Sequence, residues 1–319
     1  MKRRNIGLVL LGASLILALY SPAQPQAKEL EGNVSLSGAW ALYPMALKWA
    51  EEFKKVHPKV QLDVQAGGAG KGIADALAGV VDFGMVSRAI HPAEVEKGAF
   101  AIAVCKDAVV PTISVKNPFL NQFLKAGVKK EVFAAIWVSE AAKTWGDVLG
   151  TADKTSLHVY TRSDACGAAE TWADFFGKRQ EDLKGVGVYG DPGLAEAVRR
   201  DPLGLGYNNI NYAYDAKTLM PIQGIMILPI DLDGNGKIDE AENFYQDRNA
   251  ITKAIAAGIY PSPPARDLYL VSKGKPGKEI LVEFLKWVLS DGQKYVPETG
   301  YINLSPQKLA EGLQNIGVR

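Results

Sequence analysis

The most specific chemistry in the sequence lies in an acidic stretch, which reads Asp231-Leu-Asp-Gly-Asn-Gly-Lys-Ile-Asp-Glu-Ala-Glu242. It matches the twelve-residue EF-hand loop at every position, including the glycine at the sharp turn. Ca²⁺ prefers six to eight hard oxygen ligands, and this spacing supplies them. The stretch therefore predicts a structural calcium site. Its ligands would be Asp231, Asp233, Asn235, Lys237 through its carbonyl, Asp239 and Glu242.

The residues before this loop differ from those of a paired regulatory EF-hand. Residues 225–230 have the pattern of a strand, and Pro229 prevents a continuous helix. We therefore predict an isolated strand-loop-helix unit in which the ion is structural, because a switch needs a helix pair that opens a groove. The alternative is an acidic surface turn that binds no metal.

Three turns between an expected strand and an expected helix are candidates for anion binding. They are 37–44, the glycine-rich 67–72 and 161–167. Helix N-termini present free N–H groups and a partial positive charge. Because Arg162 lies in the third turn and Arg88 follows a strand, we predict that these helix ends converge on one anion. The alternative is that they are ordinary turns of an α/β protein.

Alternating strand and helix patterns must position these turns. A strand at 34–36 precedes a helix that begins at Pro44, and strands at 60–64 and 81–86 flank a helix at 73–78. This alternation predicts a parallel sheet in an α/β fold. Further strands are expected at 108–115, 157–160, 204–207 and 268–271, and further helices at 130–137, 145–148, 168–176, 193–200 and 280–289.

Composition and the N-terminus narrow the class of protein. The 319 residues are 47% apolar and 22% charged, with a net charge of +1, which leaves no basic excess for a nucleic acid. A basic start at 2–4, an apolar run at 6–20 and small residues up to Ala23 have the three parts of a secretory signal. We expect cleavage after Ala23 and a periplasmic protein. The alternative is an uncleaved anchor.

The two cysteines leave several hypotheses open. A disulfide between Cys105 and Cys166 is compatible with the periplasm, but the sequence does not decide it. A hydrolase that uses Cys166 is one competing function, and it would need a base from a distant residue. A calcium-dependent scaffolding protein is another. The residues around Cys166 indicate no base, so we predict that the protein is not an enzyme.

The ordered set of motifs resembles the phosphate-binding family of periplasmic solute-binding proteins of ABC transporters. The resemblance covers nearly the whole chain after the signal. It rests on Ser35-Leu-Ser-Gly-Ala, Tyr43-Pro44, Lys48-Trp49, 67–72, Val81-Asp-Phe-Gly84, Trp145-Gly-Asp147, 162–167, Gly204-Leu-Gly-Tyr207, Phe284-Leu-Lys-Trp287 and Gly300-Tyr301.

The resemblance implies two Rossmann-like α/β lobes joined by crossing strands, with the ligand in the cleft between them. Lobe 1 would comprise about 28–112 plus 267–319, and lobe 2 about 113–266. The calcium-loop-like stretch 231–242 would then be an insert in lobe 2. The implied protein is a monomer that hands a small anion to an inner-membrane ABC permease.

The family's ligand residues map onto this chain position by position. The arginine is retained as Arg162, whereas Ala69 and Ser87 stand where the family has a hydroxyl donor and an acceptor carboxylate. Ser37, Ser87 and Ser163 would supply hydroxyls, and Leu42, Gly70 and Gly167 backbone N–H groups. The implied ligand is phosphate or a related anion, with an organic acid as the alternative. The predicted anion site comprises Ser37, Trp40, Leu42, Tyr43, Ala69, Gly70, Ser87, Arg88, Arg162, Ser163, Cys166 and Gly167.

Overall fold

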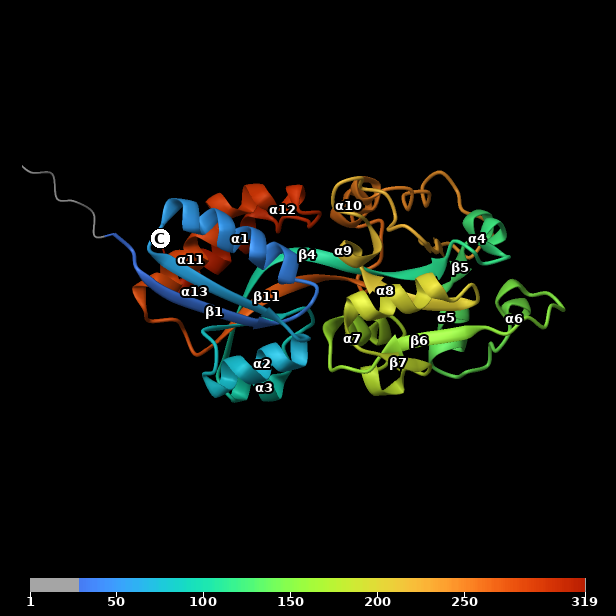
Figure 1. The fold of residues 1–319 in the computed structure, drawn as a ribbon, viewed down its shortest axis with the longest axis horizontal. Helices are drawn as coiled ribbons and strands as arrows, with labels where there is room; N and C mark the ends of the chain where they lie inside the picture. Colours follow the sequence, from blue (N-terminus) through green and yellow to red (C-terminus); the bar gives the residue numbers. More distant parts are fainter. Residues whose placement is uncertain (1–28, 319) are drawn as a thin grey trace, which may run out of the picture.

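Two long antiparallel strands run through the middle of the molecule and are shared by both of its lobes (Figure 1). The computed structural model describes residues 29–318, so the predicted signal 1–23 lies outside the described residues. Strand β4 (Ala99–Ser114) pairs with β11 (Ala265–Lys273) as far as Ala108. Beyond that residue, β4 pairs with β8 (Gly204–Asn209) and β9 (Ile225–Ile227). One strand therefore belongs to the sheets of both lobes.

Lobe 1 is built around three parallel strands. β1 (Gly32–Gly38) lies between β2 (Val60–Ala66) and β3 (Phe83–Val86), and β3 pairs with β11. Its apolar core includes Trp49, Phe53 and Phe284, which are fully buried. Its helices are α1 (Tyr43–Val56), α2 (Ala69–Ala78), α3 (Pro92–Glu96), α11 (Glu279–Leu289), α12 (Tyr295–Glu298) and α13 (Pro306–Ile316).

Lobe 2 repeats this layered arrangement on the other side of the crossing strands. β6 (His158–Arg162) lies parallel to β7 (Val186–Val188) and β8, and the short strand β10 (Ile230–Asp231) pairs with β5 (Val128–Lys129). Trp137, Trp172 and Tyr207 form its aromatic core. Its helices are α4 (Leu120–Ala126), α5 (Lys130–Trp137), α6 (Trp145–Leu149), α7 (Gly167–Asp174), α8 (Gly190–Arg200), α9 (Ile210–Ala213) and α10 (Arg248–Ala256).

Along the crossing strands, the residues that belong to the core of lobe 1 are followed by residues that belong to the core of lobe 2. On β4 the change falls between Cys105 and Ala108, and on β11 between Ala265 and Leu268. Between the two cores, Asp107 and Arg266 form a buried ion pair in which Arg266 Nε lies 2.9 Å from Asp107 Oδ1. No helix within residues 29–318 is both long and apolar enough to cross a membrane.

The α/β alternation is confirmed, but several boundaries differ from those expected. Helix α2 begins at Ala69 instead of Ile73, because the second half of the glycine-rich turn is already helical. β4 begins nine residues before the predicted 108, since it spans both lobes. The helix expected directly after the acidic loop is absent: α10 starts at Arg248, after Phe244 and Tyr245 have packed into the core.

Candidate functional site

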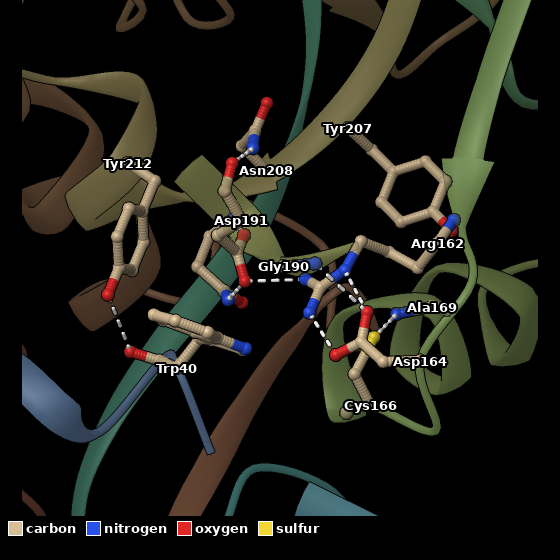
Figure 2. Close-up of polar contacts among 12 residues, drawn as sticks. Trp40, Arg162, Asp164, Cys166, Ala169, Gly190, Asp191, Tyr207, Asn208 and Tyr212 are labelled. Carbon is tan, nitrogen blue, oxygen red and sulfur yellow. Dashed lines mark hydrogen bonds and ion pairs between the residues drawn. The ribbon is translucent and has the colours of Figure 1, made fainter. Parts of the chain in front are cut away.

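A fully buried arginine lies at the carboxyl end of β6, where lobe 2 faces lobe 1. Arg162 donates from Nε and Nη2 to the two carboxylate oxygens of Asp164, at 2.8 and 2.6 Å. Its Nη1 donates to Asp191 Oδ2 at 2.6 Å (Figure 2). Both pairs exclude water, since the Arg162 and Asp191 side chains have no exposed surface and that of Asp164 has little.

A chain of polar contacts connects this arginine to the crossing strands. Asp191, on the first turn of α8, accepts hydrogen bonds from the backbone N and Nδ2 of Asn209, at 3.0 and 2.7 Å. The amide oxygen of Asn209 in turn accepts a hydrogen bond from Arg266 Nη2. Arg266 also pairs with Asp107 and contacts the Gly167 carbonyl at the start of α7. The base of the cleft is thus connected to both shared strands.

The electrostatics of this cluster keep the guanidinium charged. Burial disfavours the charged form of Arg162, but Asp191, Cys166 and Asp164 outweigh it and raise the pKa of the arginine. A guanidinium has five N–H donors, and three are used by the two aspartates. Two donors on the terminal nitrogens therefore stay available for a ligand.

The lobes touch through backbone groups of two of the predicted turns. Gly70 N–H donates to the Ala165 carbonyl at 3.0 Å. Gly167 lies against Ser87 so closely that a Cβ at Gly167 would stand 2.1 Å from the Ser87 carbonyl oxygen. Only glycine fits at this position while the lobes are closed.

A cavity of about 500 Å³ borders this contact between the lobes. Its lining includes Arg88 and His91 from lobe 1, and Arg162, Cys166 and Glu170 from lobe 2. Arg88 forms a bidentate ion pair with Glu94, at 2.9 and 2.7 Å. His91 Nε2 stands 3.7 Å from Glu170, across the gap between the lobes. The cationic groups of the cavity therefore already have carboxylate partners.

The other predicted donors have internal partners in this closed arrangement. The Leu42 and Tyr43 N–H groups donate to the Ala39 carbonyl, and Ser37 Oγ donates to Asp75 at 2.6 Å. Ala69 is buried at the first position of α2, while the Ser163 side chain is exposed. The structure thus brings Gly70, Ser87, Arg162 and Gly167 to the interface but points Ser37 toward α2.

Cys166 caps helix α7 and is poorly suited to nucleophilic catalysis. Its Sγ accepts from the Ala169 N–H at 3.4 Å. Burial raises the pKa of the thiol to about 12, although Arg162 opposes the shift. A thiolate nucleophile needs a lowered pKa. Cys105 and Cys166 are both free and buried, so they form no disulfide in this structure.

The acidic loop brings its carboxylates together away from the cleft. Oxygens of Asp231, Asp233 and Glu242 lie within 4.8 Å of one another. Asp231 accepts from the Gly234 and Gly236 N–H groups, and Glu242 accepts from those of Leu232, Asp233 and Asp239. Asn235 and Lys237 both donate to the Asp239 carboxylate.

Comparisons with known proteins agree with this two-lobed architecture. A family model described as a PBP superfamily domain matches residues 23–292. The chain belongs to the PBP superfamily. The resemblance seen in the sequence is thereby confirmed, as is the fold class.

Individual members of the PBP superfamily are similar over nearly their full length. The phosphate-binding protein PstS of Pseudomonas aeruginosa is 29% identical, over 94% of this chain and 92% of that protein. PstS of Staphylococcus haemolyticus is 26% identical, over 96% and 94%. Among solved structures, a putative phosphate ABC transporter substrate-binding protein with bound phosphate from Clostridium perfringens has a TM-score of 0.68. It is 20% identical and covers 86% of this chain and 100% of that one.

Several residues of this PBP-superfamily cleft were missed by sequence reasoning. Asp191, Asn209 and Arg266 belong to no local motif, and each is distant in sequence from Arg162. Asp164 lay inside a turn that was singled out, and its spacing of two from Arg162 was a signal for the pair. Trp40, one of the residues predicted for the anion site, does contact the opposite lobe.

Proposed function

We propose that this protein is a secreted, non-enzymatic receptor that binds phosphate or a related anion between its lobes. It would present that anion to the membrane permease of an ABC transporter. The curated relatives that cover nearly the whole chain are named phosphate-binding proteins. The elements that position Arg162 are those of the shared fold.

The observation that carries this proposal is Arg162. A buried guanidinium with two unused donors at the junction of two lobes can bind two oxygens of one anion. Asp164 and Asp191 hold the fork in place, which lowers the cost of ordering it when the ligand arrives.

Contacts across the cleft explain how binding favours closure. Gly70 meets Ala165 and Ser87 meets Gly167 only when the lobes are together. A ligand that touches both lobes gains all of its contacts in the closed state, so it shifts the population toward closure.

The test is a titration of ligand-stripped protein with phosphate, sulfate and small carboxylates, read by calorimetry and by thermal shift. A ligand at 100 times its dissociation constant stabilises a protein by about 2.7 kcal/mol. A phosphate response supports the main proposal. A response to carboxylates alone would indicate that the ligand is an organic acid. If none of these anions binds, the proposal is refuted.

We also propose that the loop 231–242 binds Ca²⁺ as a structural ion. Asp231 and Glu242 are more than nine-tenths buried, and the hydrogen bonds they accept come from backbone amides. Burying a carboxylate without a cationic side chain beside it costs free energy, and a bound metal ion would compensate its charge. The donor set of carboxylate, amide and carbonyl oxygens suits Ca²⁺.

A further inference from the structure

One tryptophan of lobe 1 is surrounded by tyrosines from both lobes. Trp40, in the turn after β1, packs edge-to-face with Tyr43 of its own lobe at a centroid distance of 6.4 Å. Across the cleft it packs in the same way with Tyr189 and Tyr212, at 6.3 and 6.5 Å. We call these four residues the aromatic clasp. Two of its three ring contacts exist only when the lobes are closed.

Two contacts with lobe 2 hold Trp40 in this position. The Tyr212 hydroxyl donates to the Trp40 carbonyl at 3.2 Å. The indole lies on Gly190, where a Cβ would stand 3.3 Å from the ring and where φ is +72°. A larger residue at 190 would be strained and would meet the ring. The opposite lobe is therefore shaped to receive this side chain.

The indole N–H of Trp40 is buried and has no hydrogen-bond partner in the part of the chain described. Figure 2 shows the nitrogen end of the ring directed toward the side of the cleft where Arg162 and Asp164 lie. Trp145 and Trp172 also lack a partner, but both are fully buried in the core of lobe 2. A buried donor without a partner costs free energy unless a ligand satisfies it.

Three backbone donors near Trp40 are already in use. The Leu42 and Tyr43 amides bond within their own turn, and the Gly70 amide bonds to Ala165. The indole N–H is therefore a donor that a ligand can take without breaking an existing bond.

We propose that the Trp40 indole N–H donates a hydrogen bond to the bound anion beside Arg162, and that the aromatic clasp seals that side of the cleft. The inference rests on the proposed function, since it names a contact in the same site. Tyr189 and Tyr212 act as positioning residues that place the indole when the lobes close. Tyr189 is 60% exposed and forms the outer rim of the clasp, so Trp40 and Tyr212 must shield the anion from water. This shielding strengthens the hydrogen bonds of the enclosed anion.

Substitutions at Trp40 separate its two roles. Trp40→Phe keeps an aromatic ring but removes the donor, whereas Trp40→Ala removes both. With inorganic phosphate as the probe, we expect Trp40→Phe to weaken binding roughly 10- to 100-fold, the effect of one hydrogen bond to a charged group. Trp40→Ala should weaken it further. Trp145→Phe is the matched control, because it makes the same change at a tryptophan whose indole N–H also lacks a partner but lies in the core of lobe 2.

Fluorescence gives an independent readout. Phosphate should change the wild-type emission, and the change should be lost in Trp40→Phe, with the melting temperature of the ligand-free variant serving as the check on folding. Equal affinities of wild type and Trp40→Phe would overturn the donor role. Equal losses in Trp40→Phe and Trp40→Ala would overturn the seal. A wild type that binds none of the anions in the titration series refutes the proposed function, and this inference with it.

Discussion

The interlobe cleft and the acidic loop differ in how their buried charges are compensated. In the cleft, Arg162 lies between two carboxylates and Arg88 is held by Glu94. In the loop, the buried carboxylates of Asp231 and Glu242 accept hydrogen bonds from backbone amides. The cleft is compensated internally, whereas the loop keeps an excess of negative charge.

This difference predicts what each region does when its partner is withdrawn. A cleft whose cations are already paired can close on itself and stay folded without an anion. A loop with several uncompensated carboxylates gains more from a cation, because their mutual repulsion is relieved. Anion binding should therefore mainly change how the two lobes are arranged, whereas Ca²⁺ binding should mainly change the stability of the loop.

The largest effect is expected when the cation of the cleft is removed. We expect Arg162→Ala to weaken phosphate binding more than 100-fold, because a bidentate charged contact is lost. The variant should also lose roughly 3–5 kcal/mol of stability, since two buried carboxylates lose their partner. Titration calorimetry below the melting temperature of the variant measures the first effect and denaturant unfolding the second.

Arg199→Ala provides the control, because Arg199 is an exposed arginine paired with Glu196 on α8. If Arg162→Ala unfolds, Arg162→Lys keeps the charge while removing the planar fork. Unchanged affinity in a folded Arg162 variant would take this residue out of the binding site.

The ion pair on the crossing strands should give a pH signature of its own. Burial raises the pKa of Asp107 to about 6, although Arg266 opposes the shift and Asp191 adds to it. Because the folded state then holds a proton more tightly than the unfolded one, stability falls as pH rises from about 4 to 6. The loss would be roughly 3 kcal/mol at about 1.4 kcal/mol per pKa unit.

Asp107→Asn should remove this slope, which urea unfolding at several pH values would measure. Asp63→Asn, at an exposed carboxylate of β2, should leave it in place. A slope that persists in Asp107→Asn would assign the pH dependence to another group.

The acidic loop offers the complementary test by cation removal. Ca²⁺ at 100 times its dissociation constant should stabilise the wild type by about 2.7 kcal/mol relative to chelator. Glu242→Gln should lose this increment because it lacks the bidentate carboxylate. Glu240→Gln, an exposed position of the same loop, should keep it. Identical melting curves with Ca²⁺ and with chelator would leave the loop as an acidic turn.

A smaller change in affinity is expected at Asp191, which pairs with Arg162. Asp191→Asn removes one of the two negative charges beside Arg162 while keeping an oxygen that can accept from it. We expect phosphate affinity to rise by up to about tenfold, or 1.4 kcal/mol, at the cost of about 1–3 kcal/mol of stability. Competition binding against the wild type would measure the gain. A lower affinity would show that Asp191 assists the anion more than it repels it.

The sequence predicted the two regions unequally, for a physical reason. All six candidate calcium ligands fall within twelve residues, so their spacing alone describes the site. The cleft is assembled from β6, α8, β8 and β11, and the network from Asp107 to Arg266 joins residues 159 positions apart. Arg162 was predicted because its turn resembles a known one, whereas Asp191 has no local signal.

Secondary structure shows the same limit. Short apolar runs bounded by turn residues predicted most strands of both lobes, because strands such as β3 and β8 are buried along their whole length. The length of β4 was missed because the polar Lys106 and Asp107 separate the apolar run 99–105 from the strand predicted at 108–115. Only the fold reveals that two cores share one strand. The missing helix after the acidic loop reflects tertiary packing of Phe244 and Tyr245, which local propensity does not report.

The shared strands also bear on how the molecule resists degradation. Because β4 and β11 run from one core into the other, the junction between the lobes is paired backbone, with one register shift between Leu268 and Tyr269. Proteases cut exposed loops, and a hinge made of hydrogen-bonded strands presents no such loop. Because the same strands contribute to both cores, the two lobes should unfold together in one transition. A protein built in this way can flex repeatedly without exposing a point at which it would be cleaved in two.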